Sequence, residues 1–165
     1  MAKNNKKIKT SLNIIALNKK ARHNYFIEQT LEAGLSLEGW EVKSLRDSKV
    51  QIKESYVILK NNELFLFGAH ISPLKSVSTH VNSDSTRTRK LLLNRLEINR
   101  IKDNINQKGA TIVPLKLYWA RGKVKLEIGM AKGKKSHDKR QDIKLKDWQR
   151  DKQRTLKETN KIFNF

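Results

Sequence analysis

Apolar and polar side chains alternate along residues 25–35, and this period of two limits most strongly what the chain can fold into. The apolar set is Tyr25, Ile27, Leu31, Ala33 and Leu35, and the opposite parity holds Glu28, Thr30, Glu32 and Gly34. A helix would need a period near 3.6 to gather such a face, whereas successive strand residues point to opposite sides. The segment therefore predicts a long strand with one buried face.

Two later segments predict β-hairpins. Residues 56–68 alternate on either side of Asn61-Asn62, a dipeptide that tolerates the positive φ angles of a tight turn. Residues 115–130 alternate around a turn near Arg121-Gly122. Because Pro114 lacks a backbone N–H, we expect the strand that follows it to begin at a sheet edge.

Two segments with helical spacing interrupt the strands. Residues 38–46 predict a short helix that closes one end of a barrel, and residues 72–88 have the composition of a loop. Residues 89–108 carry an apolar stripe, and Gly109 follows where a helix commonly ends. About six short strands with peripheral helices predict a mainly β fold, an oligonucleotide-binding (OB)-like Greek-key barrel. Periodicity alone also allows a partly open sandwich.

Positive charge is concentrated at the two ends of the chain. The sequence has 36 lysines and arginines against 16 acidic residues, a net charge of +20. Residues 1–22 hold seven basic residues and no acidic one, and residues 132–165 hold twelve against five. We expect a flexible basic N-terminus at 1–10, a barrel at 11–131 and a basic tail at 132–165.

A charge of this size attracts polyanions, so nucleic acid is the leading class of partner. An anionic membrane surface is the rival class, and basic ends that only keep the protein soluble are a further alternative. No run in the sequence approaches the roughly 20 apolar residues of a spanning helix, and the first residues lack the apolar stretch of a secretory signal. We therefore expect a soluble, cytoplasmic protein with no membrane partner.

The tail contains too few apolar residues to build its own core, so we expect it to be disordered when free. Leu145, Trp148 and Leu156 nevertheless fall near one face of a notional helix, which would allow the tail to fold against an RNA surface. A permanently disordered tail is the alternative. Trp148 has no core to join and is interpreted as a docking residue, whereas Trp40 and Trp119 are interpreted as core residues.

The sequence offers little support for catalysis or a cofactor. It has no cysteine, its four histidines lack metal-binding spacing, and it has no glycine-rich nucleotide loop. Ser136, His137 and Asp138 are consecutive, whereas the members of a hydrolase triad converge from separate positions. We expect no enzyme activity, no metal and no cofactor, and RNA cleavage is a remote alternative.

Three basic clusters are candidate RNA contacts. One precedes Asn94 at the expected start of the second helix, where cations would add to a helix N-terminal anion site beside an amide able to read a base edge. Another lies next to rings that can stack on bases, although an exposed basic turn is nearly as good an interpretation. In chain order the clusters are Lys19, Lys20 and Arg22 with His23 and Tyr25; Arg87, Arg89 and Lys90; and Lys132, Lys134 and Lys135.

Several short motifs follow one another along most of the chain. They are Asn18-Lys-Lys-Ala-Arg-His23, Glu32-Ala-Gly34, Glu41-Val-Lys-Ser-Leu-Arg46, Arg87-Thr-Arg-Lys-Leu-Leu-Leu-Asn94, Lys132-Gly-Lys-Lys and Asp138-Lys-Arg140. In this order they resemble the small protein B family from about Asn18 to Arg140. Each string alone is a weak signal, but several in register make the resemblance strong. Beyond Arg140 the chain conforms less tightly.

The resemblance implies a monomeric OB-like barrel, without catalytic activity, that binds the tRNA-like domain of transfer-messenger RNA. Elongation factor Tu with GTP would deliver this RNA to stalled ribosomes for trans-translation. A general ribosome-associated structural RNA-binding protein is the alternative. Matching positions place Asn18, His23, Glu32, Leu92, Asn94 and Lys125 on the RNA-binding face. The tail would become helical in the decoding centre and empty mRNA channel, using His137, Asp138, Lys139, Arg140, Trp148 and Leu156.

Overall fold

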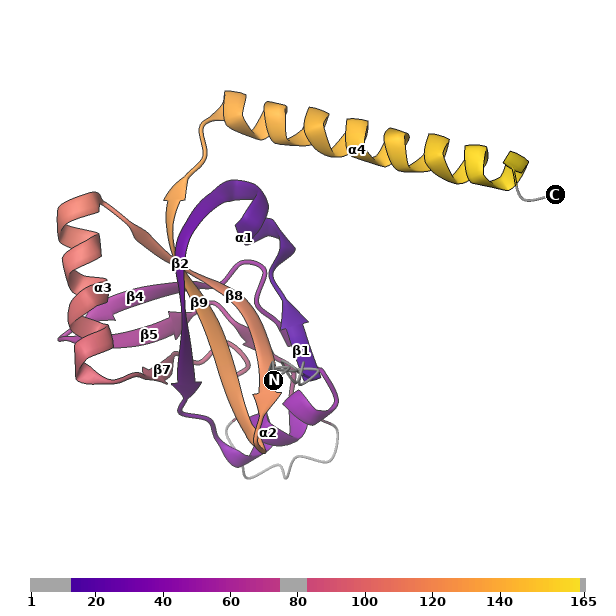
Figure 1. Cartoon of the computed structure of the whole chain (residues 1–165). Coiled ribbons are helices and arrows are strands. Elements are labelled where there is room, and N and C mark those ends of the chain that lie inside the picture. The colour runs from indigo at the N-terminus through magenta and orange to yellow at the C-terminus, as the bar shows by residue number, and fades with distance from the viewer. Residues whose placement is uncertain (1–12, 75–82, 164–165) are drawn as a thin grey trace, which may run out of the picture.

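The computed structural model describes residues 13–74 and 83–163, and strands form most of the body (Figure 1). The predicted N-terminal segment 1–10 lies outside the described residues. The strands are β1 (Asn13–Leu17), β2 (Tyr25–Leu35), β3 (Val50–Gln51), β4 (Tyr56–Lys60), β5 (Glu63–Phe67), β6 (His70–Ile71), β7 (Arg89–Leu92), β8 (Thr111–Ala120) and β9 (Lys123–Gly133). The helices are α1 (Lys19–Asn24), α2 (Gly39–Arg46), α3 (Arg95–Lys108) and α4 (Ser136–Phe163).

Six of these strands close into an antiparallel barrel. Their order is β8-β4-β5-β7-β2-β9, and β9 pairs with β8 to complete the ring. β1 pairs with the C-terminal part of β8, next to the short pairing of β4 with its N-terminal part. β3 and β6 form a separate two-stranded ribbon. The predicted mainly β, OB-like barrel of about six strands is confirmed.

The alternate apolar side chains of β2 pack against two different clusters of the core. Ile27 is paired with Ala131, and both lie in a small cluster that includes Ala21 of α1. After a bulge between Ile27 and Gln29, Leu31 is paired with Ile128 in the main core. The extra residue of a bulge reverses the face to which a given parity points. The predicted long strand is confirmed, but its single buried face is corrected to two.

β8 is an interior strand, so the predicted sheet edge at Pro114 is wrong. β8 pairs with β9 along one side and with β1 and β4 along the other. The register of β8 against β9 shifts between Pro114 and Lys116, and such a bulge tolerates a missing N–H. The Pro114 carbonyl instead accepts a hydrogen bond from Asn18 Nδ2 at 3.0 Å.

The second predicted helix begins later than its spacing indicated. Residues 89–92 form strand β7, and α3 begins after Asn94, whose side chain forms a capping box with Glu97. Gly109 ends α3 with a φ of 59°, as predicted. The helix α2 and the turn at Asn61-Asn62, with φ angles of 52° and 58°, are also confirmed.

The tail begins beyond the predicted boundary at residue 132. β9 continues to Gly133, which pairs with Tyr25 of β2. α4 then projects from the barrel as one long helix (Figure 1). Disorder of the free tail stays a prediction. In the ranges 13–74 and 83–163, no helix is long and apolar enough to cross a membrane.

Candidate RNA interface

A groove at one end of the barrel gathers four of the predicted RNA contacts, Glu32, Leu92, Asn94 and Lys125. They come from β2, β7, the residue before α3, and β9. Leu92 and Lys125 are both register partners of Gly34, one on each side of β2. A Cβ atom at Gly34 would lie 3.2 Å from Leu92 Cβ, so the glycine leaves room for that side chain. The row Leu92, Gly34, Lys125 forms the floor of the groove.

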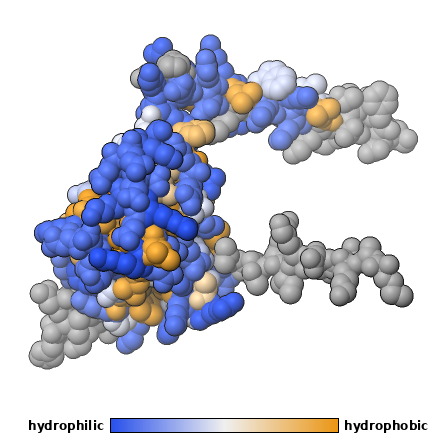
Figure 2. All heavy atoms as spheres, turned by 60° about the vertical axis from the view of Figure 1, so that its left-hand side comes forward, coloured by the Kyte–Doolittle hydropathy of each residue, from blue (hydrophilic) through white to orange (hydrophobic). Residues whose placement is uncertain are grey.

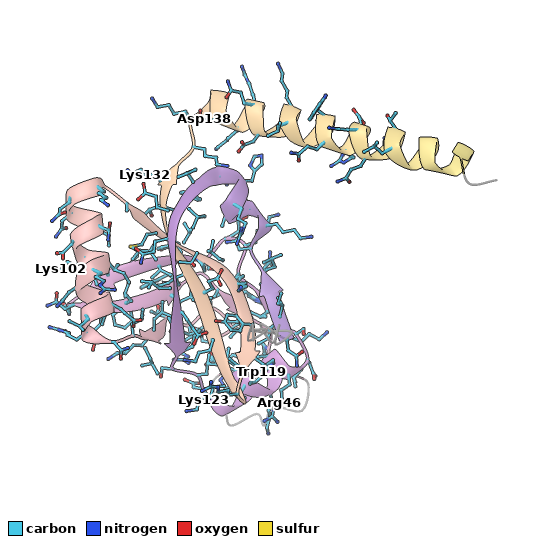
Figure 3. All side chains as sticks on the ribbon, viewed as in Figure 1. Arg46, Lys102, Trp119, Lys123, Lys132 and Asp138 are labelled. Atoms are coloured by element: carbon cyan, nitrogen blue, oxygen red, sulfur yellow. The ribbon has the colours of Figure 1, made fainter. Side chains whose placement is uncertain are left out.

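The groove combines apolar walls with a basic rim. A cavity of ≈ 440 Å³ is lined by Leu35, Leu37, Val42, Leu92, Trp119 and Val124 together with Lys123 and Lys125. An adjoining hollow adds the exposed Arg121 beside Glu32. Lys123 and Trp119 lie at the end of the barrel opposite Lys132 (Figure 3). Apolar walls suit a stacked base, and the basic rim suits its phosphates.

Glu32 is held in this groove by two side chains. The Tyr118 hydroxyl donates a hydrogen bond to Glu32 Oε2, and Lys125 Nζ lies 3.3 Å from Oε1. The Tyr118 hydrogen bond, followed by the hydrogen bond and charge of Lys125 and the charge of Arg121, lowers the pKa of Glu32. About half of the Glu32 side chain is exposed, at 50%. Glu32 is therefore an ionised hydrogen-bond acceptor that faces the groove at neutral pH.

The second group of predicted contacts lies on α1, a helix that we did not predict. Lys19, Lys20 and Arg22 are exposed on it. Lys20 pairs with Glu54 at 2.9 Å, and His23 Nδ1 donates to Asn24 Oδ1 at 3.1 Å. A segment of only six residues is too short for helical periodicity to be visible in the sequence.

Asn18 supports α1 from beneath. Its Oδ1 accepts a hydrogen bond from the Ala21 N–H at 3.1 Å, and its Nδ2 donates to the carbonyls of Ile52 and Pro114 at 3.3 and 3.0 Å. Only 5% of Asn18 is exposed. The structure thus corrects its expected place on the RNA-binding face: Asn18 caps α1 and ties it to the barrel.

Arg89 is buried, which corrects its place among the predicted RNA contacts. Its side chain has no exposed surface, and its Nε donates to Glu41 Oε1 at 2.7 Å. Its other N–H groups donate to the carbonyls of Ala69, Ser85 and Arg87. Arg87 also pairs with Glu41, so these links hold the segment before β7 against α2. Because Arg89 lies on a strand, the expected helix N-terminal anion site is wrong as well.

Three other basic candidates are paired with carboxylates; Lys90 and Lys132 lie on the surface, whereas the Lys134 side chain is mostly buried, at 17% exposure. Exposed pairs are screened by water and contribute little, so a phosphate can replace the carboxylate at small cost. Lys135 is exposed. The pairs are Lys90 with Glu63 at 2.5 Å, Lys132 with Glu28 at 3.0 Å and Lys134 with Asp142 at 2.5 Å.

The first turn of α4 holds the predicted tail residues 137–140. Asp138 Oδ2 accepts a hydrogen bond from the Lys135 backbone N–H at 3.2 Å, which satisfies a donor at the helix start. Lys139 and Arg140 follow on the same turn. The side chain of His137 lies outside the described part of the chain.

Large apolar side chains are exposed along α4. Trp148 is 60% exposed, and Lys152 Nζ lies 5.2 Å from its ring centroid. Leu145 and Leu156 are exposed as well. Figure 2 shows a few hydrophobic spots separated by hydrophilic side chains along the projecting helix. This surface can contact bases and phosphates together.

The groove and α1 lie at opposite ends of β2. Tyr25 adjoins α1 and Gly34 lies in the groove, a separation of roughly 30 Å along an extended strand. Residues 13–74 and 83–163 contain no group of three histidines or carboxylates that could hold a metal ion. The geometry therefore offers two binding regions for one large polyanion.

Tyr118, Arg121 and Lys123 are groove residues that were not predicted from the sequence. Each lies in a hairpin that was predicted correctly, but their convergence on Glu32 depends on the pairing of β9 with β2. The one available signal was Tyr118 itself, an aromatic residue with a polar hydroxyl that shares a strand face with Lys116.

A closed antiparallel barrel with an apolar, basic-rimmed groove and a basic helix belongs to the class of OB-like RNA-binding barrels. Comparison with known proteins narrows this class. Residues 15–158 match the family described as SmpB protein, and the chain belongs to this family.

The relatives are similar along nearly their whole length. The SsrA-binding protein of Vesicomyosocius okutanii is 86% identical over 160 residues, which are 97% of this chain and 98% of that one. The SsrA-binding protein of Psychrobacter cryohalolentis is 61% identical over 152 residues, covering 92% and 96%. A solved chain described as "tmRNA-SmpB: a journey to the center of the bacterial ribosome" is 44% identical, with a TM-score of 0.60, and the match covers 73% of this chain and 85% of that one.

Proposed function

We propose that this protein is a ribosome-rescue adaptor that binds the tRNA-like domain of transfer-messenger RNA and brings it to stalled ribosomes. Membership in the SmpB family and the similarity to SsrA-binding proteins support the proposal. A solved relative whose description names both transfer-messenger RNA and the ribosome supports both partners.

The observation that carries the proposal is the division of the molecule into two parts with separate surfaces, the barrel and α4. The barrel presents the groove and α1, which are suited to a folded RNA. α4 projects from the end of the barrel at which α1 lies (Figure 1). Trp148 is exposed on this helix, among basic residues. An adaptor needs two such surfaces, because it must hold one RNA while it contacts another.

In this proposal α4 occupies the decoding centre and the empty mRNA channel. Its lysines and arginines follow ribosomal RNA phosphates, and Trp148 stacks on or packs against a base. The barrel acts as a monomer in the cytoplasm and performs no chemistry itself. Elongation factor Tu with GTP takes part only through the aminoacylated RNA.

RNA recovered with the protein tests this function. Full-length protein is purified from cells by affinity, and the bound RNA is sequenced. We expect strong enrichment of transfer-messenger RNA over ribosomal RNA. Equal recovery of all ribosomal RNA, in proportion to total ribosomes, would instead identify a general structural protein of the ribosome. Shortened RNA products would point to cleavage.

A charge-matched pair of variants connects the enrichment to the groove. Lys125→Glu reverses a charge in the groove, whereas Lys102→Glu makes the same change on exposed α3. We expect Lys125→Glu to lower recovery of transfer-messenger RNA by about tenfold or more, because it adds a carboxylate beside Glu32 and the RNA. Lys102→Glu should leave recovery within about twofold. Equal losses in both variants would mean that only net charge matters.

A further inference from the structure

Tyr118 has a buried ring whose hydroxyl group reaches the groove. Only 4% of the residue is exposed, and its hydroxyl donates to Glu32 Oε2. Lys116 Nζ lies 5.4 Å from the ring centroid on one side and pairs with Glu127 at 2.8 Å. Burial, followed by the hydrogen bond and charge of Glu32 and the charge of Glu127, raises the pKa of Tyr118, so the hydroxyl keeps its proton at neutral pH. Tyr118 is thus a fixed donor.

The carboxylate of Glu32 retains free acceptor positions after these contacts. Tyr118 occupies one position on Oε2 and Lys125 one on Oε1. A carboxylate offers about four acceptor positions in its plane. Glu32 lines two hollows and half of its side chain is exposed, so a ligand can reach the carboxylate. One open position on each oxygen suits a ligand with two parallel N–H donors.

Among the four standard bases, guanine presents this pattern. Its Watson–Crick edge carries N1–H and an N2 amino group side by side, whereas adenine and cytosine offer one amino group and uracil one imino group there. The edge is available only where the guanine is unpaired. The exposed side chain of Leu92 lines the same hollow as Glu32 and suits one face of such a base.

We propose that Tyr118 is a positioning residue that orients Glu32 to accept two hydrogen bonds from the Watson–Crick edge of an unpaired guanine. This inference rests on the proposed function, because the guanine belongs to the bound tRNA-like domain. The guanine contact also explains why a carboxylate is present on a basic surface, although its charge opposes phosphate binding. Glu32 excludes other bases, since an acceptor repels the carbonyl edge of uracil.

The test combines protein variants with a modified RNA. The probe is a transcript of the tRNA-like domain of transfer-messenger RNA, bound to full-length protein and followed by fluorescence anisotropy. Inosine replaces each unpaired guanosine in turn, which removes the N2 amino group and keeps N1–H. We expect inosine at one position to lower the affinity about 3- to 10-fold for the unchanged protein and to have no effect for Glu32→Gln.

Tyr118→Phe should lower the affinity about 3- to 10-fold, and the Glu32→Gln, Tyr118→Phe double variant should bind like Glu32→Gln alone. Tyr56→Phe is the matched control, because Tyr56 is exposed and stacks on Phe67 away from Glu32. Additive losses in the double variant, or no inosine position coupled to Glu32, would overturn the inference.

A direct measurement separates positioning from folding. Carbon-detected NMR titration of the Glu32 carboxyl in the free protein should show a higher midpoint in Tyr118→Phe than in the unchanged protein. Lys125, Arg121, Glu127 and Glu97 face the same carboxylate and are left in place in both. If the unchanged protein fails to prefer the tRNA-like domain over a scrambled RNA of equal length, the proposed function fails, whatever the variants do.

Discussion

At the scale of single residues, the buried pair of Arg89 with Glu41 is the most consequential interaction in the barrel. Both side chains have no exposed surface, and Arg89 reaches three backbone carbonyls as well. Removing one partner of such a pair leaves a buried charge, at a cost of about 3–5 kcal/mol. We expect Arg89→Met to lower the free energy of unfolding by about this amount in urea denaturation.

The control for that variant is Arg46→Met, which removes an arginine from the exposed surface of α2. Its effect should stay within about 0.5 kcal/mol. Similar small effects for both variants would show that water enters the Arg89 site and screens the charges.

Glu32 predicts a pH dependence at the same scale. Its pKa is lower in the folded protein than its ordinary value, chiefly because Tyr118 donates to the carboxylate. The resulting stabilisation is complete above the ordinary value and is lost as the pH falls through the lowered pKa. We expect the difference in unfolding free energy between the unchanged protein and Glu32→Gln to shrink steadily as urea denaturation is repeated from neutral to acidic pH. A constant difference would contradict the lowered pKa.

At the scale of elements, Lys134 joins α1, a candidate RNA-contact helix, to the tail helix α4. Its backbone N–H donates to the Asn24 carbonyl at 2.9 Å, and its Nζ donates to the Arg22 carbonyl at 3.3 Å. The same Nζ pairs with Asp142 on α4 at 2.5 Å. Lys134 is mostly buried, at 17% side-chain exposure, so this contact is better shielded than a surface pair. The direction of α4 therefore depends on α1.

The absence of cysteine from the sequence allows a direct measurement of that direction. Spin labels on Asn99→Cys in α3 and Gln149→Cys in α4 report a distance distribution between barrel and tail, since both positions are exposed. We expect Lys134→Met to broaden the distribution, because it removes both Nζ contacts. Lys135→Met, on the exposed neighbour, should leave the width unchanged. Equal widths for all three proteins would show that Lys134 does not set the tail direction.

At the scale of the whole molecule, removal of α4 should separate RNA binding from rescue. The truncation belongs after Lys135, because α4 begins at Ser136 and β9, Lys134 and Lys135 are then kept. We expect RNA affinity within about threefold of the full chain and loss of peptide tagging on stalled ribosomes. The dependence of RNA affinity on salt concentration should also change little. Its slope is about 0.7 log units of affinity per log unit of salt for each single-strand phosphate neutralised. A large fall in this slope would place tail lysines at the transfer-messenger RNA.

The barrel was predictable from the sequence because burial on a strand repeats every two residues. The two buried faces of β2 could not be predicted. A bulge after Ile27 directs the alternate apolar side chains first to one core cluster and then to the other, and the sequence pattern does not change at that point. α3 was placed too early because Leu91 and Leu93 extend its apolar stripe, while pairing with β5 and β2 holds residues 89–92 in a strand.

The candidate site was predictable only in part, and for a similar reason. The exposed cations of α1 follow from charge alone, Asn94 follows from its place after a basic cluster, and Glu32 came from the family resemblance. The burial of Arg89 depends on Glu41, which lies 48 residues away and meets it only in the closed barrel. Long-range pairing of this kind leaves no local trace in the sequence.

The length of α4 turns its attachment into a lever arm. A helix of 28 residues extends about 42 Å, so a tilt of 10° at its base displaces its far end by about 7 Å, the width of a nucleotide step or two. The tilt would occur at the short connection through Lys134 and Lys135, which lies beside α1. A small shift of α1 would therefore cause a larger displacement of the far end of α4, while the shape of the barrel stays the same.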